Sequence, residues 1–376
     1  MEVRRVENPS DLRRFIDLPY KLHARDPVWV PPLKRDVRAL LSRTKNPFFD
    51  HAQAEYFLAL RDGRVVGRIA AISNRLHNEV HEDRVGFFGF FECIDDPAAA
   101  AVLFDAAGEW LADHGHDIMR GPASFSVNDE CGLLVENFTA PPTLMTPHNP
   151  RYYVALVEGA GFIKAKDLLM YHHGAPDGRD RDEVPERLTR VIDMIKRRQG
   201  VTIRPLRMEE FEQEVERVKR LYNESWEKNW GFVPLTEKEI DHLAAEFKPV
   251  VVADLVPFVE KDGRPIGFAM AMPDLNVVFS ANRSGRMFPT VLKLLWMLKT
   301  ERLHRLRIML LGVVPKFRGK GIDAILYHWI WTKGGEHGMG WGEAGWILEE
   351  NHAMRQAAEK LEFSAYKTYR FYDRPL

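Results

Sequence analysis

The chain has 376 residues, of which 45% are hydrophobic and 28% are charged, and its 53 Lys and Arg nearly balance 54 Asp and Glu. This length predicts two domains of a globular protein, and the near-neutral charge argues against a nucleic-acid partner bound through a basic surface. Two cysteines exclude a disulfide framework and zinc-ligand spacing, and no apolar stretch is long enough to span a membrane. We therefore expect a cytoplasmic protein with no metal and no membrane partner.

The first half predicts an α/β arrangement that begins with a hairpin. Strands at 55–60 and 65–72 flank Asp62-Gly63, a pair typical of tight turns between antiparallel strands. Four elements follow in the order strand, helix, strand and helix, at 85–94, 97–114, 118–121 and 149–161. Asp96 stands before Pro97 and is expected to cap the N-terminus of the first of these helices.

A change in composition separates the two halves. Residues 174–183 are polar, charged and rich in turn formers, and Pro185 suits the first turn of a helix that follows. That helix has an apolar face at helical spacing, made of Leu188, Val191, Ile192 and Ile195. These features predict a first domain at 1–175, a linker and helix at 176–200, and a second domain at 201–376.

The second half repeats the same plan at greater length. A strand at 201–205 is followed by helices at 209–226 and 236–247, and a second hairpin turns at Asp262-Gly263 between 256–261 and 264–272. The remaining elements alternate between helix and strand, at 289–298, 307–314, 322–337, 345–348, 351–361 and 364–372. This order predicts an α/β domain with a mixed sheet.

A glycine-rich turn, Arg318-Gly319-Lys320-Gly321, lies between a predicted strand and a predicted helix. Glycine lets the backbone approach a ligand closely, and the free N–H groups at the start of a helix attract phosphate. Arg318 and Lys320 add positive charge, so the turn predicts a pyrophosphate site; the alternative is an ordinary basic surface turn. A P-loop is excluded because Gly319-Lys320 is followed by Gly321 rather than Ser or Thr.

The turn resembles the acyl-CoA-binding motif of the GNAT superfamily of N-acyltransferases, [QR]-x-x-G-x-[GA]. Arg318 and Gly321 match the motif, whereas Asp323 differs at its third marked position. The resemblance covers most of 201–376, including the hairpin and the segment from Asn351 to Phe363. It implies an α/β fold of two GNAT-like domains, each a mixed, mostly antiparallel twisted sheet flanked by helices. It also implies acetyl-CoA or another acyl-CoA as co-substrate, and an amine as acceptor.

The family pattern assigns residues of this chain to parts of the cofactor. The strand before the turn would hold the pantetheine arm through Leu311, Gly312, Val313 and Val314. The turn and helix start would hold the pyrophosphate through Arg318, Gly319, Lys320, Gly321, Ile322 and Asp323. Asn351 corresponds to an asparagine that often lies near the cofactor.

The tyrosine that usually protonates the departing thiolate in this family is replaced here by Ala358. Tyr366, Tyr369 and Tyr372, on the predicted last strand, are candidate substitutes, and packing is the alternative role for each; we select Tyr366 and Tyr369. Glu343, Glu349 and Glu350 border the expected point of acyl transfer, and we select Glu349 as the candidate base. Catalysis would then proceed by direct attack of the amine.

An aromatic segment before Pro234 is the candidate acceptor site. Its residues Trp226, Asn229, Trp230 and Phe232 suit a small, partly apolar acceptor, and a hydrophobic cap is the alternative. Three functions remain open: an N-acyltransferase acting on a small amine, a catalytically silent CoA-binding or interaction protein, and a transferase that uses aminoacyl-tRNA. The protein is expected to be a monomer or homodimer.

The first half lacks an equivalent of the glycine turn. The corresponding residues 91–98 contain neither glycine nor a basic residue, and they carry Glu92, Asp95 and Asp96. A carboxylate at the cap would occupy the N–H groups that a phosphate needs. We therefore expect a degenerate first domain that does not bind CoA.

Overall fold

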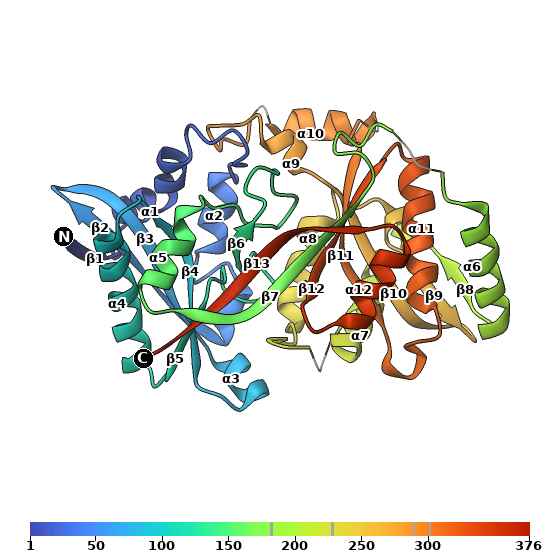
Figure 1. Ribbon diagram of the computed structural model, residues 1–376, viewed down its shortest axis with the longest axis horizontal. Coiled ribbons are helices and arrows are strands. Elements are labelled where there is room, and N and C mark those ends of the chain that lie inside the picture. The colour runs from blue at the N-terminus through green and yellow to red at the C-terminus, as the bar shows by residue number, and fades with distance from the viewer. Residues whose placement is uncertain (181–182, 227–228, 289, 301) are drawn as a thin grey trace. The chain divides into compact units, whose positions relative to one another are not determined.

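The structure of the protein is a computed structural model that describes residues 1–180, 183–226, 229–288, 290–300 and 302–376. The chain forms two compact units, and each takes more than one stretch of sequence (Figure 1). Unit 1 comprises Met1–Leu168, Asn276–Leu292 and Lys367–Leu376, and unit 2 comprises Leu169–Leu275 and Lys293–Tyr366. The domain boundaries predicted from the sequence, at 175 and 201, stay a prediction.

Unit 1 is built on a mixed sheet that is mostly antiparallel. Strands β1 to β4 pair as antiparallel neighbours, β5 lies parallel to β4, and the C-terminal part of β13 pairs with both β5 and β6. The strands are β1 (Glu2–Arg5), β2 (Ala52–Arg61), β3 (Arg64–Asn74), β4 (Val85–Cys93), β5 (Ile118–Gly121), β6 (Leu133–Glu136) and β13 (Ser364–Pro375). The helical segments are α1 (Pro9–Leu22), α2 (Lys34–Leu40), η1 (Pro47–Asp50), α3 (Arg75–His81), α4 (Pro97–Asp113), α5 (Tyr152–Gly159) and α9 (Asn276–Phe279).

Helix α4 covers the sheet of unit 1 with an alanine-rich apolar face. Leu103 and Phe104 are fully buried in a cluster that includes Phe88 of β4. The helix begins where the sequence predicts, because the carboxylate of Asp96 accepts hydrogen bonds from the backbone N–H groups of Ala98 and Ala99 at 2.9 and 3.3 Å. The expected cap is therefore confirmed.

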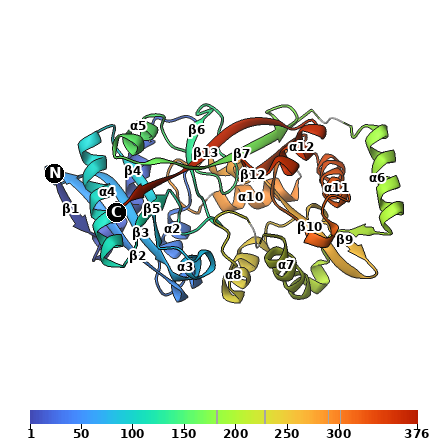
Figure 2. The same ribbon diagram turned by 60° about the horizontal axis from the view of Figure 1, so that its bottom comes forward.

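Unit 2 contains its own run of strands in the order β7, β12, β11, β10, β9, β8, and among these β11 and β12 run parallel. Figure 2 shows its strands β9 and β10 side by side. The strands are β7 (Ile163–His173), β8 (Thr202–Arg204), β9 (Phe258–Lys261), β10 (Arg264–Pro273), β11 (Arg305–Val313) and β12 (Trp341–Leu348). The helical segments are α6 (Glu186–Gln199), η2 (Met208–Glu210), α7 (Phe211–Trp226), α8 (Glu237–Phe247), η3 (Ala253–Leu255), α10 (Thr290–Lys299), η4 (Pro315–Phe317), α11 (Ile322–Glu336) and α12 (His352–Lys360).

Helices pack on both faces of the unit 2 sheet. Helix α11 buries Ile322, Ile325 and Ile330 in one core cluster, which also takes Ala269 and Ala271 of β10. Phe268 and Met270, which alternate with these alanines in sequence, join a second cluster with Leu221 and Tyr222 of α7. This alternation follows from the two-residue period of a strand, and it positions α7 and α11 on opposite faces of β10.

Strand β7 and the N-terminal elements α1 and α2 are absent from the sequence prediction. β7 begins with Lys164, Lys166 and Asp167, and these charges obscured its alternation. The helix expected at 289–298 is α10, and Pro289 lies outside the described residues. So do Arg181 and Asp182 of the expected linker. Among the residues that the structure describes, no helix has the length and apolar character needed to cross a bilayer.

Candidate functional site

Strands β11 and β12 separate partway along their length. Their parallel pairing runs from Arg305 opposite Trp341 to Ile308 opposite Ala344, and over the described residues it stops there. The register of β11 with β10 shifts at this point, because Met270 pairs with Leu310 and the next residue pairs with Ile308. Met309 is thus the extra residue of a bulge, which bends a strand and interrupts its pairing.

The separation leaves a notch bordered by Met309–Val313 of β11. The predicted pantetheine residues Leu311, Gly312 and Val313 lie along this edge, paired on their other side with β10. Val314 follows and donates its N–H to the carbonyl of Ile266 at 3.0 Å. A strand edge with unpaired amide groups is suited to an extended, amide-containing ligand arm.

The glycine turn connects β11 to α11. Gly319 and Gly321 have φ values of +69° and +81°, a left-handed conformation that favours glycine. Gly321 is the N-cap of α11 and provides no side-chain hydrogen bond to the first turn. The backbone N–H groups at this helix start are therefore available for an anion, as the sequence predicts for Ile322 and Asp323.

Arg318 braces the turn through its hydrogen bonds to backbone. Its Nε donates to the carbonyl of Val313 at 3.1 Å, and its Nη2 donates to the carbonyl of Ser225 in α7. Lys320, in contrast, places its Nζ 5.0 Å from the ring centre of Phe317 and is exposed. The geometry thus gives Arg318 a positioning role and leaves the Lys320 ammonium facing solvent at the turn.

Asn351 directly precedes α12, and Ala358 lies on this helix. Asn351 caps this helix, since its Oδ1 accepts the N–H of Met354 at 3.2 Å. Ala358 is completely buried in the core cluster that also contains Phe363. The methyl side chain at the position of the usual tyrosine is therefore a packing group.

A polar cluster lies beside the last paired residues of β11 and β12. Glu343 is fully buried, and its carboxylate accepts a hydrogen bond from the hydroxyl of Tyr366. Its Oε1 is 3.7 Å from Nε of Arg307, the residue opposite it in the strand register. Arg307 is itself 3% exposed and donates to the carbonyl of Gly345 at 3.2 Å. This pair directly precedes the notch.

His172, at the end of β7, completes the cluster. Its ring centre is 4.8 Å from that of Tyr366, in an edge-to-face arrangement. Burial lowers the pKa of His172, and the nearby Glu343 carboxylate opposes that effect. The imidazole is therefore held neutral near pH 7. The sequence identified Tyr366 but favoured Glu349 over Glu343, because nothing in the sequence alone showed which glutamate faces the strand pair.

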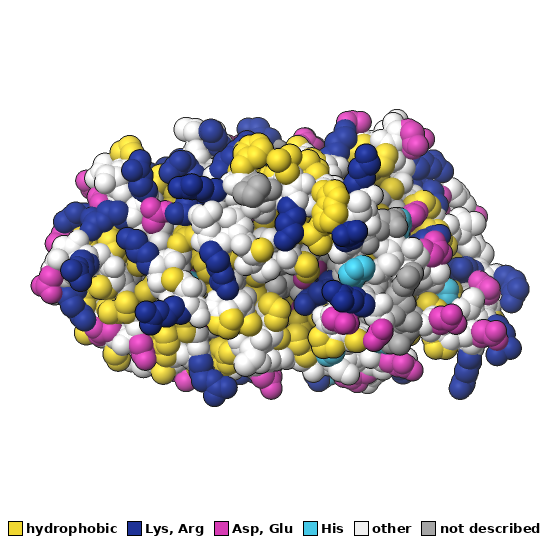
Figure 3. All heavy atoms as spheres, turned by 90° about the horizontal axis from the view of Figure 1, so that it is seen from above, with side chains coloured by type: hydrophobic (Ala, Val, Ile, Leu, Met, Phe, Trp, Pro, Cys, Tyr) yellow, Lys and Arg dark blue, Asp and Glu magenta, His cyan; other side chains and the backbone are white. Residues whose placement is uncertain are grey.

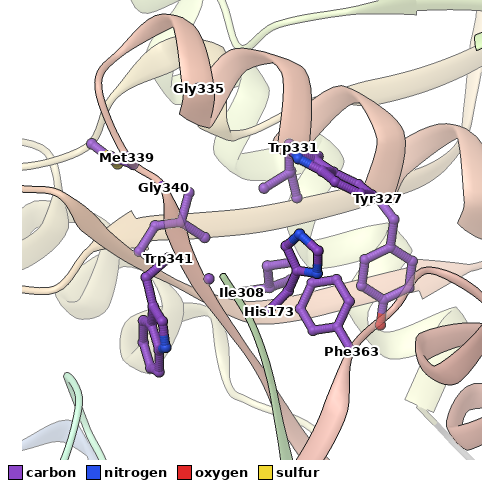
Figure 4. A pocket seen from close by; sticks show the side chains of 12 residues that line it. His173, Ile308, Tyr327, Trp331, Gly335, Met339, Gly340, Trp341 and Phe363 are labelled. Atoms are coloured by element: carbon purple, nitrogen blue, oxygen red, sulfur yellow. The ribbon is translucent and has the colours of Figure 1, made fainter. Parts of the chain in front are cut away.

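An apolar pocket lies under α11, next to the same strand pair (Figure 4). Leu306 and Ile308 of β11 line it, and their side chains alternate with Arg307 along the strand. Aromatic rings gather at one side: the centre of Phe363 is 5.5 Å from that of His173 and 5.9 Å from that of Tyr327. The remaining lining residues are Ile330, Trp331, Gly335, Met339, Gly340, Trp341 and Gly342.

The other predicted catalytic residues lie elsewhere. Glu349 follows β12 and is half-buried, and its carbonyl accepts Nη1 of Arg355 at 3.0 Å. Tyr369 belongs to unit 1, where its buried hydroxyl donates to the carbonyl of Pro147 at 3.0 Å. Of the three predicted catalytic residues, Tyr366 and Glu349 thus lie in unit 2. The catalytic assignments stay predictions.

The predicted acceptor residues follow the C-terminal end of α7. Trp226 packs over β11, where a Cβ on Gly312 would approach its ring to 2.5 Å. Phe232 is 6% exposed and packs against Tyr222, with ring centres 5.4 Å apart and the rings tilted to each other. Trp230 and Asn229 are half-buried, and Glu227 and Lys228 lie outside the described residues. Trp226 is therefore the member of this set that lies against the notch strand.

Unit 1 has the same strand plan, but its own chain fills the place of the notch. The parallel pairing of β4 and β5 ends at Phe87 opposite Arg120, as in unit 2. Ala123 then donates its N–H to the carbonyl of Phe88 at 2.9 Å. A Cβ on Gly89 would lie 1.8 Å from the Ala123 carbonyl oxygen, so the two segments pack directly together. Together with the Asp96 cap, this closed strand pair supports the hypothesis of a degenerate first unit.

The strand plan, the bulge and the uncapped α11 start define a protein with two GNAT-like units. The solved structure of a tandem GNAT protein from the clavulanic acid biosynthesis pathway matches 100% of this chain and 98% of its own, with a TM-score of 0.58 and 13% identity. A GCN5-related N-acetyltransferase from Sphaerobacter thermophilus matches with a TM-score of 0.54 and 12% identity, over 100% of this chain and 95% of its own. The fold is that of the GNAT superfamily, with tandem domains.

Two other proteins share more of this sequence. The bacterial ceramide synthase of Caulobacter vibrioides is 39% identical over 99% of this chain and 96% of its own length. Protein YghO of Escherichia coli is 34% identical over 100% of this chain and 95% of its own. The chain therefore belongs to the family that contains these two proteins. No protein-family model matches it.

Within the described ranges, no group of three or more His, Cys, Asp or Glu is arranged to hold a metal ion.

Proposed function

We propose that the protein transfers a long acyl chain from CoA to the amino group of a long-chain amino alcohol, forming a ceramide-type amide. The observation that carries this proposal is the 39% identity, over 99% of the chain, with the bacterial ceramide synthase. The GNAT fold supports acyl transfer from acyl-CoA. The proposed donor and acceptor are larger than the acetyl group and small amine expected from the sequence.

The notch and the glycine turn fit the two ends of CoA. Backbone groups of Met309–Gly312 that face away from β10 would bind the amides of the pantetheine arm. The N–H groups at the start of α11, with Lys320 beside them, would bind the pyrophosphate. Arg318 would act indirectly, because its hydrogen bonds to Val313 and Ser225 hold the turn in place.

The pocket under α11 fits a long acyl chain. Its lining is mostly apolar, and Ile308 belongs both to this lining and to the last strand pair before the notch. An acyl chain that continues beyond the thioester would therefore meet an apolar surface. Burial and the neighbouring Asp323 raise the pKa of Tyr327, so this lining residue stays uncharged. An acetyl group would leave such a pocket unused.

The polar cluster fits the proton transfer that the reaction needs. The amine nitrogen attacks the thioester carbonyl carbon, the C–N bond forms, the C–S bond breaks, and the ammonium proton must be removed. The Tyr366 hydroxyl donates its hydrogen bond to Glu343, so the hydroxyl proton points toward that carboxylate. We assign a relay in which the Tyr366 oxygen takes the amine proton while its own proton passes to Glu343.

The same scheme accounts for the alanine at position 358. A thiol has a pKa of about 8.5, so the thiolate of CoA leaves without a strong acid beside it. The buried Ala358 methyl is then compatible with turnover. Glu349, half-buried just after β12, is the second candidate base.

The proposal is tested with the purified chain, palmitoyl-CoA and sphinganine, measuring thiol release and the N-acyl product by mass spectrometry. Palmitoyl-CoA should give turnover with sphinganine, and acetyl-CoA with a short amine should give much less. The reverse preference would restore the small-acceptor hypothesis.

A silent CoA-binding protein is the second candidate, because Ala358 and Asp323 both depart from the GNAT pattern. Binding of acyl-CoA by calorimetry, without thiol release on any long-chain or short amine, would favour this candidate over the enzyme.

A further inference from the structure

Helix α10 exposes an apolar face. Leu292, Leu295 and Trp296 are 58%, 49% and 49% exposed, and their spacing of three and four residues places them on one side of the helix. Phe288, just before the helix, is 63% exposed. Leu294, on the opposite side of the helix, is buried, with 6% of its surface exposed. The helix thus buries one apolar side and presents a second one to solvent.

Such a face is unusual on a protein surface. A helix that is apolar all round is normally buried, and contiguous exposed apolar patches mark contact with a partner or a membrane. Phe288 and Trp296 are the two aromatic residues among the large hydrophobic side chains that are exposed in the described part of the chain. Since each exposes about half of its surface or more, the patch represents a sizeable apolar area open to water.

The charged residues near this face in the sequence are mostly basic. The surrounding segment 276–303 carries five basic residues, namely Arg283, Arg286, Lys293, Lys299 and Arg302, and a single acidic one, Glu301. Lys293 and Lys299 are exposed on α10 itself, and Arg302 places its guanidinium 4.5 Å from the ring centre of Trp296. Figure 3 looks onto α10 and shows hydrophobic side chains interspersed with Lys and Arg.

We propose that this α10 face binds an anionic lipid surface. Apolar side chains with an interfacial tryptophan would enter the boundary between headgroups and acyl chains, as in helices that lie in the membrane plane. The basic residues would meet lipid phosphates, each contributing about 1 kcal/mol near an anionic surface. Lys and Arg suit this position because their stems pack along apolar groups while the charge reaches the headgroups. The proposal does not depend on the reaction proposed above.

The test is co-sedimentation of the full chain with phosphatidylglycerol vesicles and with phosphatidylcholine vesicles, without any substrate. The wild type should sediment with the anionic vesicles and much less with the neutral ones. Leu292→Glu/Trp296→Glu should lose most of this binding. Lys293→Glu/Lys299→Glu should lose the preference for anionic lipid.

A matched control uses exposed apolar residues elsewhere. Ile163 and Met194 are 67% and 57% exposed, so Ile163→Glu/Met194→Glu adds the same charge at comparable exposure. This control should bind vesicles as the wild type does, and thermal melts should show all variants folded. Wild-type protein that stays in the supernatant would overturn the proposal. So would vesicle binding by Leu292→Glu/Trp296→Glu that equals that of the control Ile163→Glu/Met194→Glu. So would a dimer that Leu292→Glu/Trp296→Glu converts to monomer with no effect on vesicle binding, since the face would then join two copies.

Discussion

The hydroxyl of Tyr366 donates a hydrogen bond to Glu343, a carboxylate with no exposed surface, one strand position before β11 and β12 part. Arg307 faces the same carboxylate from the opposite strand at 3.7 Å. A buried carboxylate beside one cation and one hydroxyl can accept a proton through that hydroxyl. The relationship therefore makes Tyr366 a route for a proton into the site.

Replacing Tyr366 by Phe should lower kcat about 100-fold or more and change the KM for acyl-CoA little, since proton transfer contributes on that scale. Steady-state thiol release measures both constants. Tyr369→Phe is the matched control, because its hydroxyl bonds the Pro147 carbonyl in unit 1 and its loss should cost about 1 kcal/mol of stability. If Tyr369→Phe loses activity and Tyr366→Phe keeps it, the assignment belongs to Tyr369 instead.

Glu343→Gln separates the structural role of Glu343 from its chemical role. Removing one partner of a buried ion pair costs about 3–5 kcal/mol, so this variant should lose stability along with activity. Arg307→Met/Glu343→Gln removes both partners and should regain much of the stability in urea unfolding. The double variant should stay inactive. Recovery of activity together with stability would show that Glu343 only supports the fold.

Gly319→Ala tests the turn without a steric clash. Gly319 and Gly263 have φ values of +69° and +73°, and a Cβ at either position meets nothing within 4 Å. Both alanine variants should therefore lose about 1 kcal/mol or slightly more from backbone strain. Only Gly319→Ala should weaken acyl-CoA binding in calorimetry, because Gly263 lies in the β9–β10 hairpin. Equal CoA affinity for the two variants would contradict the pyrophosphate assignment.

The strand and helix plan of this chain could be predicted because its turns are marked locally. Asp62-Gly63, Asp262-Gly263 and the Asp96 cap each fix one boundary through short-range geometry. Met309 carries no such mark. Its bulge arises from pairing with β10, which is distant in sequence, so the notch could only be seen in the folded chain.

The same limit applies to the candidate site. Arg318 was expected at the phosphates, yet its guanidinium bonds two backbone carbonyls, and one of these lies in α7. Glu343 and Glu349 are alike in sequence, but only the register of β12 puts Glu343 opposite Arg307. The residue types in the sequence indicated which side chains could carry out acid–base chemistry. The strand register then determined which of them lie next to one another.

The pH dependence of stability should reflect His77 in unit 1. Burial lowers the pKa of His77 from 6.5 to about 3. Burial also raises the pKa of Asp83, 3.5 Å away, and this carboxyl acts on the pH dependence in the opposite sense. Between pH 3 and pH 6.5, His77 therefore binds a proton in the unfolded chain but not in the folded one. Stability should therefore fall as the pH drops from about 6.5 toward 3, by up to about 1.4 kcal/mol per pH unit from this group.

In His77→Leu the free energy of unfolding should decrease less steeply as the pH falls, because the contribution of one bound proton is lost. Urea unfolding across the pH range measures this slope. His242 has a side chain 43% exposed, so His242→Leu serves as the control and should leave the slope unchanged. An unaltered slope in His77→Leu would mean that other groups account for the acid sensitivity.

Gly335→Phe should shorten the acyl chain that the enzyme accepts. Gly335 lines the pocket under α11, and a Cβ there would meet no atom within 4 Å, so a phenyl ring can extend into the open space. Activity with palmitoyl-CoA should fall, while activity with a short acyl-CoA should hold or rise; kcat/KM over a series of chain lengths measures the change. Gly159→Phe on α5 is the control, since that position is equally open but belongs to unit 1. A loss that is the same for every chain length would place the acyl chain outside this pocket, whereas an unchanged chain-length preference with full activity would show that the ring turns away from it. The chain-length profile therefore tests the pocket separately from the reaction, because turnover with short donors remains as a measure of intact chemistry.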